Sequence, residues 1–192
     1  MARKVRRVRY TLDAKGIKRL PQEEIVAILR GADDLIMKGG RTMLYKILKG
    51  SREKRVLELK LDNSPVYGFY KHLTEEQIMA RIDWVILEGY LDLEYDYRLP
   101  LLVYTKRGWQ VEKDTYSDEL LHDFDEMLDK GINHFNMRHL KDKNRELILI
   151  LLDKIQASSD RRYIPILEAW EKIDYKKVRK RIRQVISQLT QG

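Results

Sequence analysis

Residues Thr74–Gly108 read TEEQIMARIDWVILEGYLDLEYDYRLPLLVYTKRG, and this stretch decides the fold. Thr74 and Gln77 have the spacing of a capping box, in which both side chains accept bonds from backbone N–H groups at the start of a helix. Apolar residues then recur at helical spacing up to Gly89, which can take the left-handed conformation that ends a helix. After that glycine the apolar period drops to two, with a turn at residues 96–100. The stretch predicts one helix followed by a β-hairpin, as at the end of a winged helix-turn-helix.

Two further helices are predicted before this stretch. Pro21–Arg30 begins with a proline suited to a first helical turn, and Arg41–Lys49 offers a second apolar face. Glycines at positions 31, 39, 40 and 50 separate the elements. Three helices and a hairpin within about a hundred residues are enough for one small domain.

Five motifs in this region, in the same order, resemble the RQC domain, which is the winged helix at the C-terminal side of RecQ helicases. They are ILKGSREKR (Ile47–Arg55), PVYG (Pro65–Gly68), Lys71 with Thr74, LEGYL (Leu87–Leu91) and VYTKRG (Val103–Gly108). The similarity spans Pro21–Lys113, and the match is closest to small stand-alone bacterial proteins called RQC-minor, which carry the domain without a helicase. The resemblance implies a winged helix that binds DNA.

Composition limits the class of protein. The chain has 192 residues, 43% of them hydrophobic and 35% charged, and it has no cysteine. This excludes disulfides, thiolate catalysis and cysteine-based zinc sites, and it fits a cytosolic protein. No apolar stretch is long enough to cross a bilayer, so we expect a cytoplasmic protein without a membrane partner.

The net charge of +8 is unevenly distributed. Residues 1–20 hold eight Lys/Arg and one Asp, residues 21–113 hold fifteen charges of each sign, and the last segment, 144–192, is again basic. We therefore divide the chain into a basic N-terminal arm (1–20), an RQC-like winged-helix domain (21–113) and an α-helical C-terminal domain (114–192). The expected fold class is mostly α with one small β-hairpin.

The predicted DNA contacts begin at the end of the second helix. The resemblance implies that Lys49, Ser51 and Arg55 contact the DNA backbone. Gly50 and Ser51 are expected to present backbone N–H groups and a hydroxyl to phosphate, and charge is added by Arg52, Lys54 and Arg55. The alternative is a plain helix C-cap followed by solvated cations.

Further contacts are predicted on both sides of this loop. Lys71 matches a family lysine that faces phosphate, with a solvated loop as the alternative, and Arg81 lies on the exposed side of the next helix. At the hairpin tip we expect Tyr97 to stack on a base pair, Arg98 to meet phosphate and Leu99 to lie beside them, unless Tyr97 is an ordinary turn aromatic. The arm offers backbone or minor-groove contacts through Arg3, Lys4, Arg6, Arg7 and Arg9; the alternative is a disordered tail.

The second half reads as helices only. We expect helices over Tyr116–Lys130 and Asp174–Gln191 and one helix, or two in line, over Asn133–Gln156, with the apolar run Leu147–Leu152 at their centre. One side of the last helix is lined by Lys176, Arg179, Lys180 and Arg183, either as a solvated face or as a second phosphate-binding face. Residues 114–192 are also the place where a homodimer or a protein partner is expected to dock.

Enzyme motifs are missing from the sequence. It has no phosphate-binding loop, dinucleotide fingerprint or nucleophile elbow, and its four histidines are scattered. We expect no catalytic residues, no metal and no cofactor. The favoured function is non-catalytic recognition of duplex, branched or forked DNA, in repair or recombination. The alternatives are a protein-interaction adaptor and a winged-helix transcriptional regulator.

Overall fold

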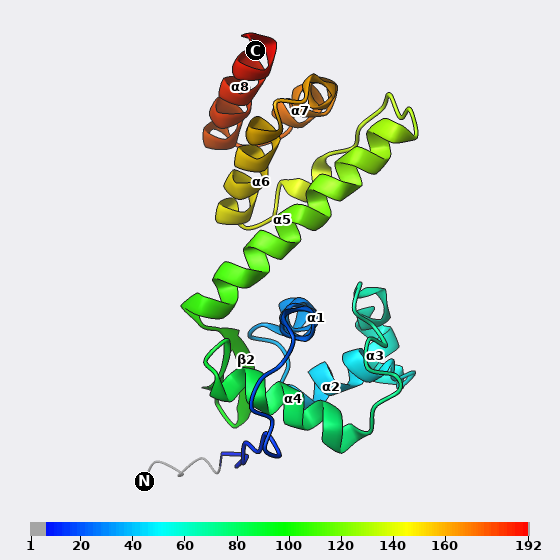
Figure 1. The fold of residues 1–192 in the computed structure, drawn as a ribbon, viewed down its shortest axis with the longest axis vertical. Coiled ribbons are helices and arrows are strands. Elements are labelled where there is room, and N and C mark those ends of the chain that lie inside the picture. The colour runs from blue at the N-terminus through cyan, green and yellow to red at the C-terminus, as the bar shows by residue number, and fades with distance from the viewer. Residues whose placement is uncertain (1–6, 192) are drawn as a thin grey trace. The chain divides into compact units, whose positions relative to one another are not determined.

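The computed structural model describes residues 7–191, so that Arg3, Lys4 and Arg6, predicted to contact DNA, lie outside the described residues (Figure 1). The chain divides into two compact units, Met1–Glu112 and Lys113–Gly192, which are described separately. The fold class expected from the sequence is confirmed: one two-stranded antiparallel hairpin accompanies helices throughout the described part of the chain.

The first unit is a winged helix. Its elements are α1 (Gln22–Ala32), the 3₁₀ turn η1 (Asp33–Leu35), α2 (Arg41–Lys49), α3 (Lys54–Glu58), the 3₁₀ turn η2 (Leu61–Asn63), α4 (Glu75–Leu87), β1 (Leu91–Asp96) and β2 (Leu99–Tyr104). Helix α1 continues through Gly31, which the sequence suggested as a break. A Cβ at Gly31 would lie 3.1 Å from Leu44 on α2. That glycine allows close packing of the two helices rather than ending the first.

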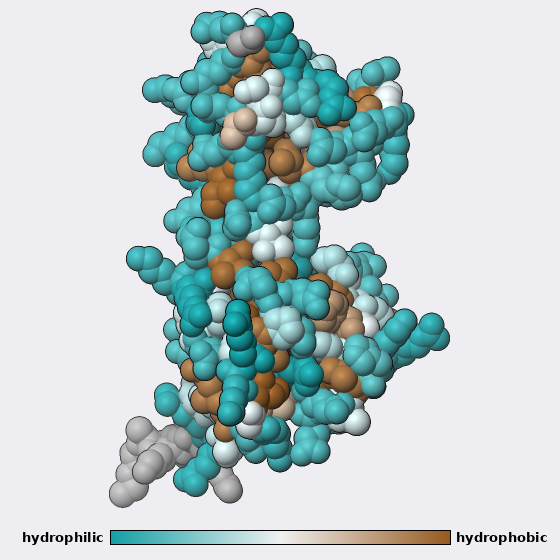
Figure 2. All heavy atoms as spheres, viewed as in Figure 1, coloured by the Kyte–Doolittle hydropathy of each residue, from teal (hydrophilic) through white to brown (hydrophobic). Residues whose placement is uncertain are grey.

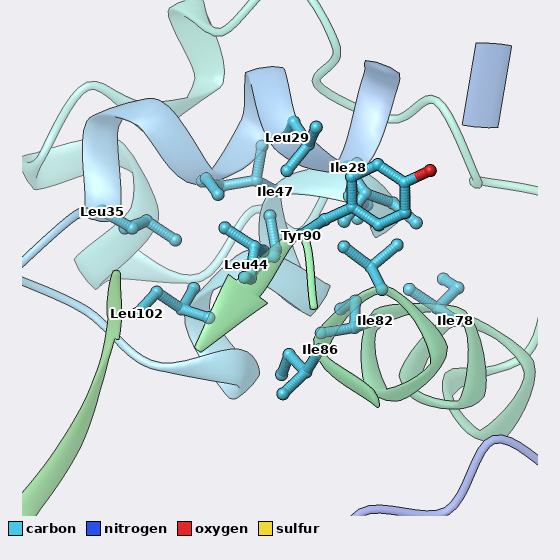
Figure 3. Close-up of a cluster of buried hydrophobic side chains, with 14 of the residues drawn as sticks. Ile28, Leu29, Leu35, Leu44, Ile47, Ile78, Ile82, Ile86, Tyr90 and Leu102 are labelled. Atoms are coloured by element: carbon cyan, nitrogen blue, oxygen red, sulfur yellow. The ribbon is translucent and has the colours of Figure 1, made fainter. Parts of the chain in front are cut away.

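The core of the first unit joins three helices to the hairpin. Side chains of Ile28 from α1, Leu44 from α2, Ile82 from α4 and Leu102 from β2 point toward one another, and each is fully buried (Figure 3). Burial of one such side chain contributes roughly 1.5–3 kcal/mol. The apolar positions predicted from helical spacing therefore hold the winged helix together.

Helix α4 has the ends predicted for it. Gln77 N–H donates to Thr74 Oγ1 at 3.3 Å, and Thr74 N–H donates to Gln77 Oε1 at 3.0 Å, so that the capping box is complete. Gly89 follows the helix with φ +71°. A left-handed glycine at this position turns the chain directly into β1.

The hairpin is paired in register from Leu91↔Tyr104 to Asp96↔Leu99. Its second strand has a further neighbour, because Met37 N–H donates to Leu102 O and Leu102 N–H donates to Gly39 O, both at 2.9 Å. A Cβ at Gly40 would lie 2.8 Å from the carbonyl oxygen of Pro100. The segment before α2 thus lies against β2 and fixes the wing on the helices.

The hairpin passes into a long helix without a loop. Thr105 Oγ1 donates to Gly89 O at 2.7 Å and accepts from Gly108 N–H at 3.1 Å, which caps α5 (Lys106–Asp129). A Cβ at Gly108 would lie only 1.9 Å from Tyr90 O. The helix expected to start at Tyr116 is therefore the later part of one that starts at Lys106, because the hydroxyl of Thr105 nucleates it immediately after the strand.

The second unit contains the rest of α5 and three more helices. They are α6 (Arg145–Ser158), α7 (Ile164–Glu171) and α8 (Lys176–Gln191), with the 3₁₀ turns η3 (Arg138–Leu140) and η4 (Arg161–Tyr163). The helix predicted over Asn133–Gln156 is wrong in its first part, because Asn144 caps α6 through a 2.8 Å bond from Glu146 N–H. Leu147, Ile148, Leu151 and Leu152 are buried in the core of this unit, as predicted.

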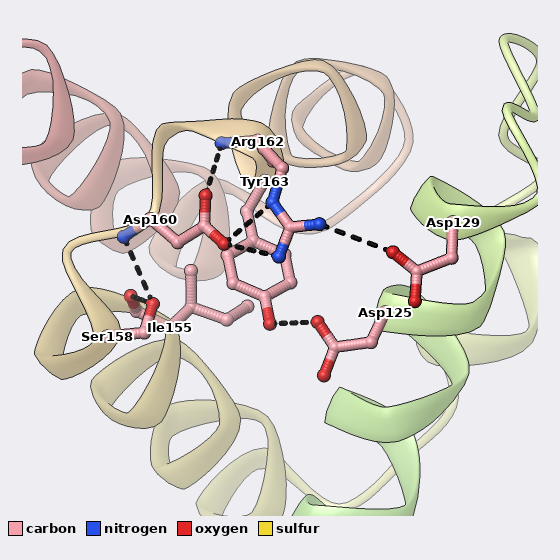
Figure 4. Close-up of polar contacts among 7 residues, drawn as sticks. All are labelled: Asp125, Asp129, Ile155, Ser158, Asp160, Arg162 and Tyr163. Atoms are coloured by element: carbon pink, nitrogen blue, oxygen red, sulfur yellow. Dashed lines mark hydrogen bonds and ion pairs between the residues drawn. The ribbon is translucent and has the colours of Figure 1, made fainter.

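Polar contacts join α5 to the turn before α7 within the second unit (Figure 4). Tyr163 Oη donates to Asp125 on α5, and the Arg162 guanidinium lies 2.8 Å from Asp160 and 3.3 Å from Asp129. Hydrogen bonds and the charge of Arg162 lower the pKa of Asp160. Arg162 and Asp129 are largely exposed, so their ion pair contributes little to stability, whereas the buried Tyr163 fixes η4 on α5 through its bond to Asp125.

The viewed surface is largely hydrophilic, with only small hydrophobic patches (Figure 2). Among the described residues no helix has both the length and the apolar character needed to cross a membrane.

Candidate nucleic-acid interface

The glycine–serine corner, Lys49–Arg52, is the turn that ends α2. Gly50 has φ +77°, its N–H donates to Ile47 O at 3.0 Å, and Ser51 N–H donates to Lys46 O at 2.9 Å. This is the pattern by which a glycine closes a helix. Both N–H groups are used inside the chain, so the expectation that they face an anion is wrong, and the helix-cap alternative describes the backbone.

The corner is held by a second glycine turn. A Cβ at Gly50 would lie 3.1 Å from Gly68 Cα, and Gly68 N–H donates to Ile47 O at 2.9 Å. Tyr67 Oη donates to Ser51 O at 2.9 Å. A side chain at Gly50 would press on Gly68, whereas Gly68 is suited to glycine by its left-handed φ of +75°.

Two of the predicted DNA contacts are engaged within the chain. Lys49 Nζ donates to the carbonyls of Lys71 (2.9 Å) and Leu73 (2.6 Å), and Arg81 Nε donates to Glu24 at 2.8 Å. The structure therefore brings Lys49 and Lys71 together, with the side chain of Lys71 exposed. Lys49 and Arg81 support the fold of this region, and a contact from either to DNA stays a prediction.

The cations that follow the corner are exposed. Lys54 lies 3.6 Å from Glu58 in a solvated pair of the kind that contributes little. Arg52 and Arg55 are exposed and form no ion pair with any residue from 7 to 191. They remain available to an anion from outside.

A basic groove of about 1220 Å³ lies between four segments of the first unit. Its walls come from the arm (Val8–Thr11), the segment before and into α2 (Lys38–Met43), the wing (Leu99–Leu101) and the chain after α3 (Leu59–Pro65). Its cationic lining residues are Arg9, Arg30, Lys38, Arg41, Lys46, Arg55 and Lys60. Asp34 is the one acidic residue that lines it in the described chain, so the groove attracts anions.

Three of these cations already have partners. Arg41 is paired with the buried Asp83, Lys46 lies 2.6 Å from Glu53, and the buried Arg30 lies 3.8 Å from Glu112. The other four are exposed and have no ion pair within residues 7–191: Arg9, Lys38, Arg55 and Lys60. These four cations are the part of the groove that can bind a ligand.

Lys38 and Lys60 are not among the residues predicted from the sequence. Lys38 precedes the Gly39-Gly40 pair, which we interpreted only as a break between helices. Lys60 follows α3 in a left-handed conformation, with φ +55°. The position of Lys38 before a glycine pair could have indicated an exposed cation. No local sequence pattern indicates that Lys60 lines the groove.

The wing tip is a two-residue turn formed by Tyr97 and Arg98. Tyr97 has φ +53°, which is unusual for a bulky residue, and it is 67% exposed. Leu99 is 58% exposed, and the Arg98 guanidinium lies 5.5 Å from the centre of the Tyr97 ring. The tip thus presents an aromatic and an aliphatic side chain to solvent beside a cation.

The arm lies against the wing from Arg7 onward. Val8 N–H donates to Arg98 O at 2.9 Å, and Tyr95 Oη donates to Val8 O at 2.6 Å. The rings of Tyr10 and Tyr95 stack at 6.0 Å, and the Arg7 guanidinium lies 4.9 Å from the Tyr95 ring. The described part of the arm is therefore part of the winged-helix unit and places Arg9 at the groove.

Within residues 7–191 no group of His, Asp and Glu is arranged to hold a metal ion. The cations of the groove suit binding of a polyanion, and the exposed aromatic side chain at the wing tip offers a surface for stacking.

Comparison with known proteins agrees with this arrangement. The family model described as the RQC domain matches residues 18–122. The ATP-dependent DNA helicase RecQ of Bacillus subtilis is 31% identical over 74 residues, which is 38% of this chain and 12% of the helicase. The chain thus spans only a small part of the length of that relative, and no solved structure matches. Because the family model covers more than half of its residues, the chain belongs to the RQC domain family, the winged-helix DNA-binding domain of RecQ helicases.

Proposed function

We propose that this protein binds duplex DNA by its phosphate backbone, with the wing tip at a duplex end or fork, and does no chemistry on it. The observation that carries the proposal is the basic groove, where four exposed cations without ion pairs lie beside an exposed aromatic tip. Cations from several segments around one groove fit the regular phosphates of a duplex. Arg52 and Lys71 belong to the RQC-like motifs and are exposed, and we include them among the proposed contacts.

Backbone recognition is favoured over reading of bases. The exposed positions at the start of α4 are Glu75, Glu76 and Gln77, which are poorly suited to a polyanion. Helix α3 has only five residues, Lys54–Glu58. A transcriptional regulator would need a helix rich in Arg, Asn and Gln in the major groove, and neither helix provides one.

The wing tip supplies the proposed preference for ends and forks. Tyr97 and Leu99 are exposed where an apolar side chain gains by stacking on a terminal base pair. Arg98, whose guanidinium lies beside the Tyr97 ring, would then contact the last phosphate. DNA with open ends arises during repair and recombination, which is where we propose that the protein acts.

The remaining predicted residues have supporting roles in this proposal. Lys49, Gly50 and Ser51 hold the corner from which Arg52 projects, and Arg81 fixes α4 on α1 through Glu24. Arg3, Lys4 and Arg6 would lengthen the cationic arm that Arg7 and Arg9 begin.

The test is titration of the protein against blunt duplex, forked, Holliday-type and single-stranded DNA of equal length, at several salt concentrations. Backbone binding predicts that log K falls linearly with log salt, at a slope of about −0.9 for each phosphate contact. Stronger binding to the forked and blunt forms than to a closed circular duplex, titrated alongside them, supports the proposed mode. Retention of one sequence far above all others would support a regulator, and failure to bind any form would support a protein-interaction adaptor.

A further inference from the structure

The second unit carries a lysine face that the winged helix does not explain. It consists of Lys172, Lys176, Lys177 and Lys180, at the end of α7 and the start of α8, together with Tyr175 and Lys141. All six side chains are exposed, and within residues 7–191 none of the four lysines first named forms an ion pair. We propose that this lysine face is a second nucleic-acid site, which binds single-stranded DNA.

All the charged side chains of α8 are positive. Residues 176–191 contain six Lys or Arg and no Asp or Glu. Of the six, Arg181 lies 2.6 Å from Asp153 and Arg183 lies 2.5 Å from Glu171, so that these two are satisfied within the unit. Lys176, Lys177 and Lys180 face solvent without such partners, which leaves a local excess of positive charge for a polyanion.

The position of these lysines on the helix supports a binding role. Cations in the first turn of a helix lie at the positive end of its dipole, which is unfavourable. The first turn of α8 contains no acidic residue, and Asp174 just before it is buried, accepting from Trp170 Nε1 at 2.7 Å and from Tyr175 N–H at 2.6 Å. A bound phosphate would add negative charge beside the ammonium groups of this turn.

Tyr175 indicates that the ligand has exposed bases. Its side chain is 59% exposed, and Lys141 Nζ lies 5.1 Å from the centre of its ring. An open aromatic ring surrounded by ammonium groups is the combination that binds single strands, because bases stack on the ring while the cations follow the backbone. In a closed duplex the bases are already stacked on each other, so no base would be free to stack on the Tyr175 ring.

A membrane surface fits this face less well. An amphipathic helix binds lipid by burying its apolar side in the bilayer. The apolar side of α8, formed by Val178, Ile182, Val185 and Leu189, is already buried in the core of the second unit. Since the chain also belongs to a DNA-binding family, DNA is the polyanion that fits both the exposed lysines and the Tyr175 ring.

The experiment uses the full chain and a fluorescent dT oligonucleotide. The variant K176E/K177E/K180E should lose at least tenfold in affinity for the oligonucleotide while keeping its affinity for blunt duplex. Acidic residues in the first helical turn favour the helix, so this variant should fold with an unchanged or raised Tm. The control K18E/K106E/R145E changes the net charge equally at exposed positions that belong to neither surface and should bind the oligonucleotide normally.

Tyr175→Ala should lower oligonucleotide affinity about tenfold, while Tyr175→Phe should not change it, because the ring and not the hydroxyl stacks. An oligonucleotide with 5-iododeoxyuridine should crosslink to Tyr175 under ultraviolet light, as read by mass spectrometry.

The proposal does not depend on the groove, and the two can fail separately. K38E/R55E/K60E should lose duplex binding and keep oligonucleotide binding. Equal oligonucleotide affinity in the wild type and K176E/K177E/K180E would overturn the proposal. The same holds if the lysine face selects phosphatidylserine vesicles over the oligonucleotide.

Discussion

The basic groove and the lysine face of α8 both expose cations without ion pairs, but they are built differently. The groove collects Arg9 from the arm, Lys38 from the segment before α2, and Arg55 and Lys60 from α3 and the chain after it. The lysine face takes Lys176, Lys177 and Lys180 from the first two turns of one helix. The first surface exists only while tertiary packing holds its segments together, whereas three of the lysines of the second lie on α8 alone and only Lys172, Tyr175 and Lys141 come from other segments.

Their ligands should differ for the same reason. A groove with walls on several sides can follow a rigid duplex, while one convex helix with an exposed Tyr175 suits a flexible strand. The four predictions below test this contrast, from the largest expected effect to the smallest.

Gly108→Ala should destabilise the first unit and, with it, the groove that depends on the packing of that unit. A Cβ at Gly108 would lie 1.9 Å from Tyr90 O, which is backbone and has no room to move. We expect the first unit to lose more than about 3 kcal/mol in the free energy of unfolding, measured by denaturant titration. Gly131→Ala is the matched control in the second unit: it meets nothing within 4 Å, and its φ of +66° should cost only about 1–2 kcal/mol. A first unit as stable as the wild type after Gly108→Ala would contradict the packing described for the wing.

Asp83→Ala should release the arm from the groove. Asp83 is buried, pairs with Arg41 and accepts from Asp13 N–H at 2.9 Å, so its removal leaves the Arg41 charge without its carboxylate. The expected loss of stability is about 3 kcal/mol, with faster tryptic cleavage at Arg9. The double variant R41A/D83A is the control, because it removes the uncompensated charge and should recover part of the loss. Cleavage at an unchanged rate would show that the arm is held by other contacts.

K38E/R55E/K60E should lower duplex affinity without affecting stability. Three phosphate contacts become repulsive, so we expect a fall on the order of 100-fold at 0.1 M salt and a salt slope smaller by about three. Affinity and thermal stability are both measured, with K18E/K106E/R145E as the charge-matched control. If the control lost as much affinity as the groove variant, only net charge would matter, and the groove would have no special role.

Tyr97→Gly should change stability and binding in opposite directions. The φ of +53° at Tyr97 suits glycine, so the free energy of unfolding should rise by up to about 1 kcal/mol. The loss of a stacking ring should lower the preference for forked over closed duplex by about fivefold. Tyr97→Phe should leave both quantities as they are. Unchanged fork preference in Tyr97→Gly would leave the wing without a role in end recognition.

Local signals made much of the fold predictable. The capping box at Thr74 and Gln77, the glycine stops at Gly50 and Gly89, and the strand alternation each depend on residues within a few positions of one another. Such signals act before tertiary contacts form and are visible in the sequence. The start of α5 was missed because Thr105 closes the hairpin and caps the helix at once.

The candidate site was harder to predict from the sequence than the fold, because it depends on tertiary packing. Arg9 and Arg55 were predicted and line the groove, but Lys38 and Lys60 join them only through the packing of the segments on each side. Lys49 looked like a phosphate ligand, and the structure shows its ammonium bonded to two carbonyls. A sequence shows which residues are cations but not which of them already have partners.

The protection of both edges of the hairpin affects how the protein behaves at high concentration. An open strand edge can recruit a strand from another molecule and begin aggregation. Here residues 37–39 occupy backbone groups of β2, while β1 carries the exposed acids Asp92, Glu94 and Asp96. The protein therefore keeps an exposed two-stranded hairpin whose edges do not favour pairing with a strand of another molecule.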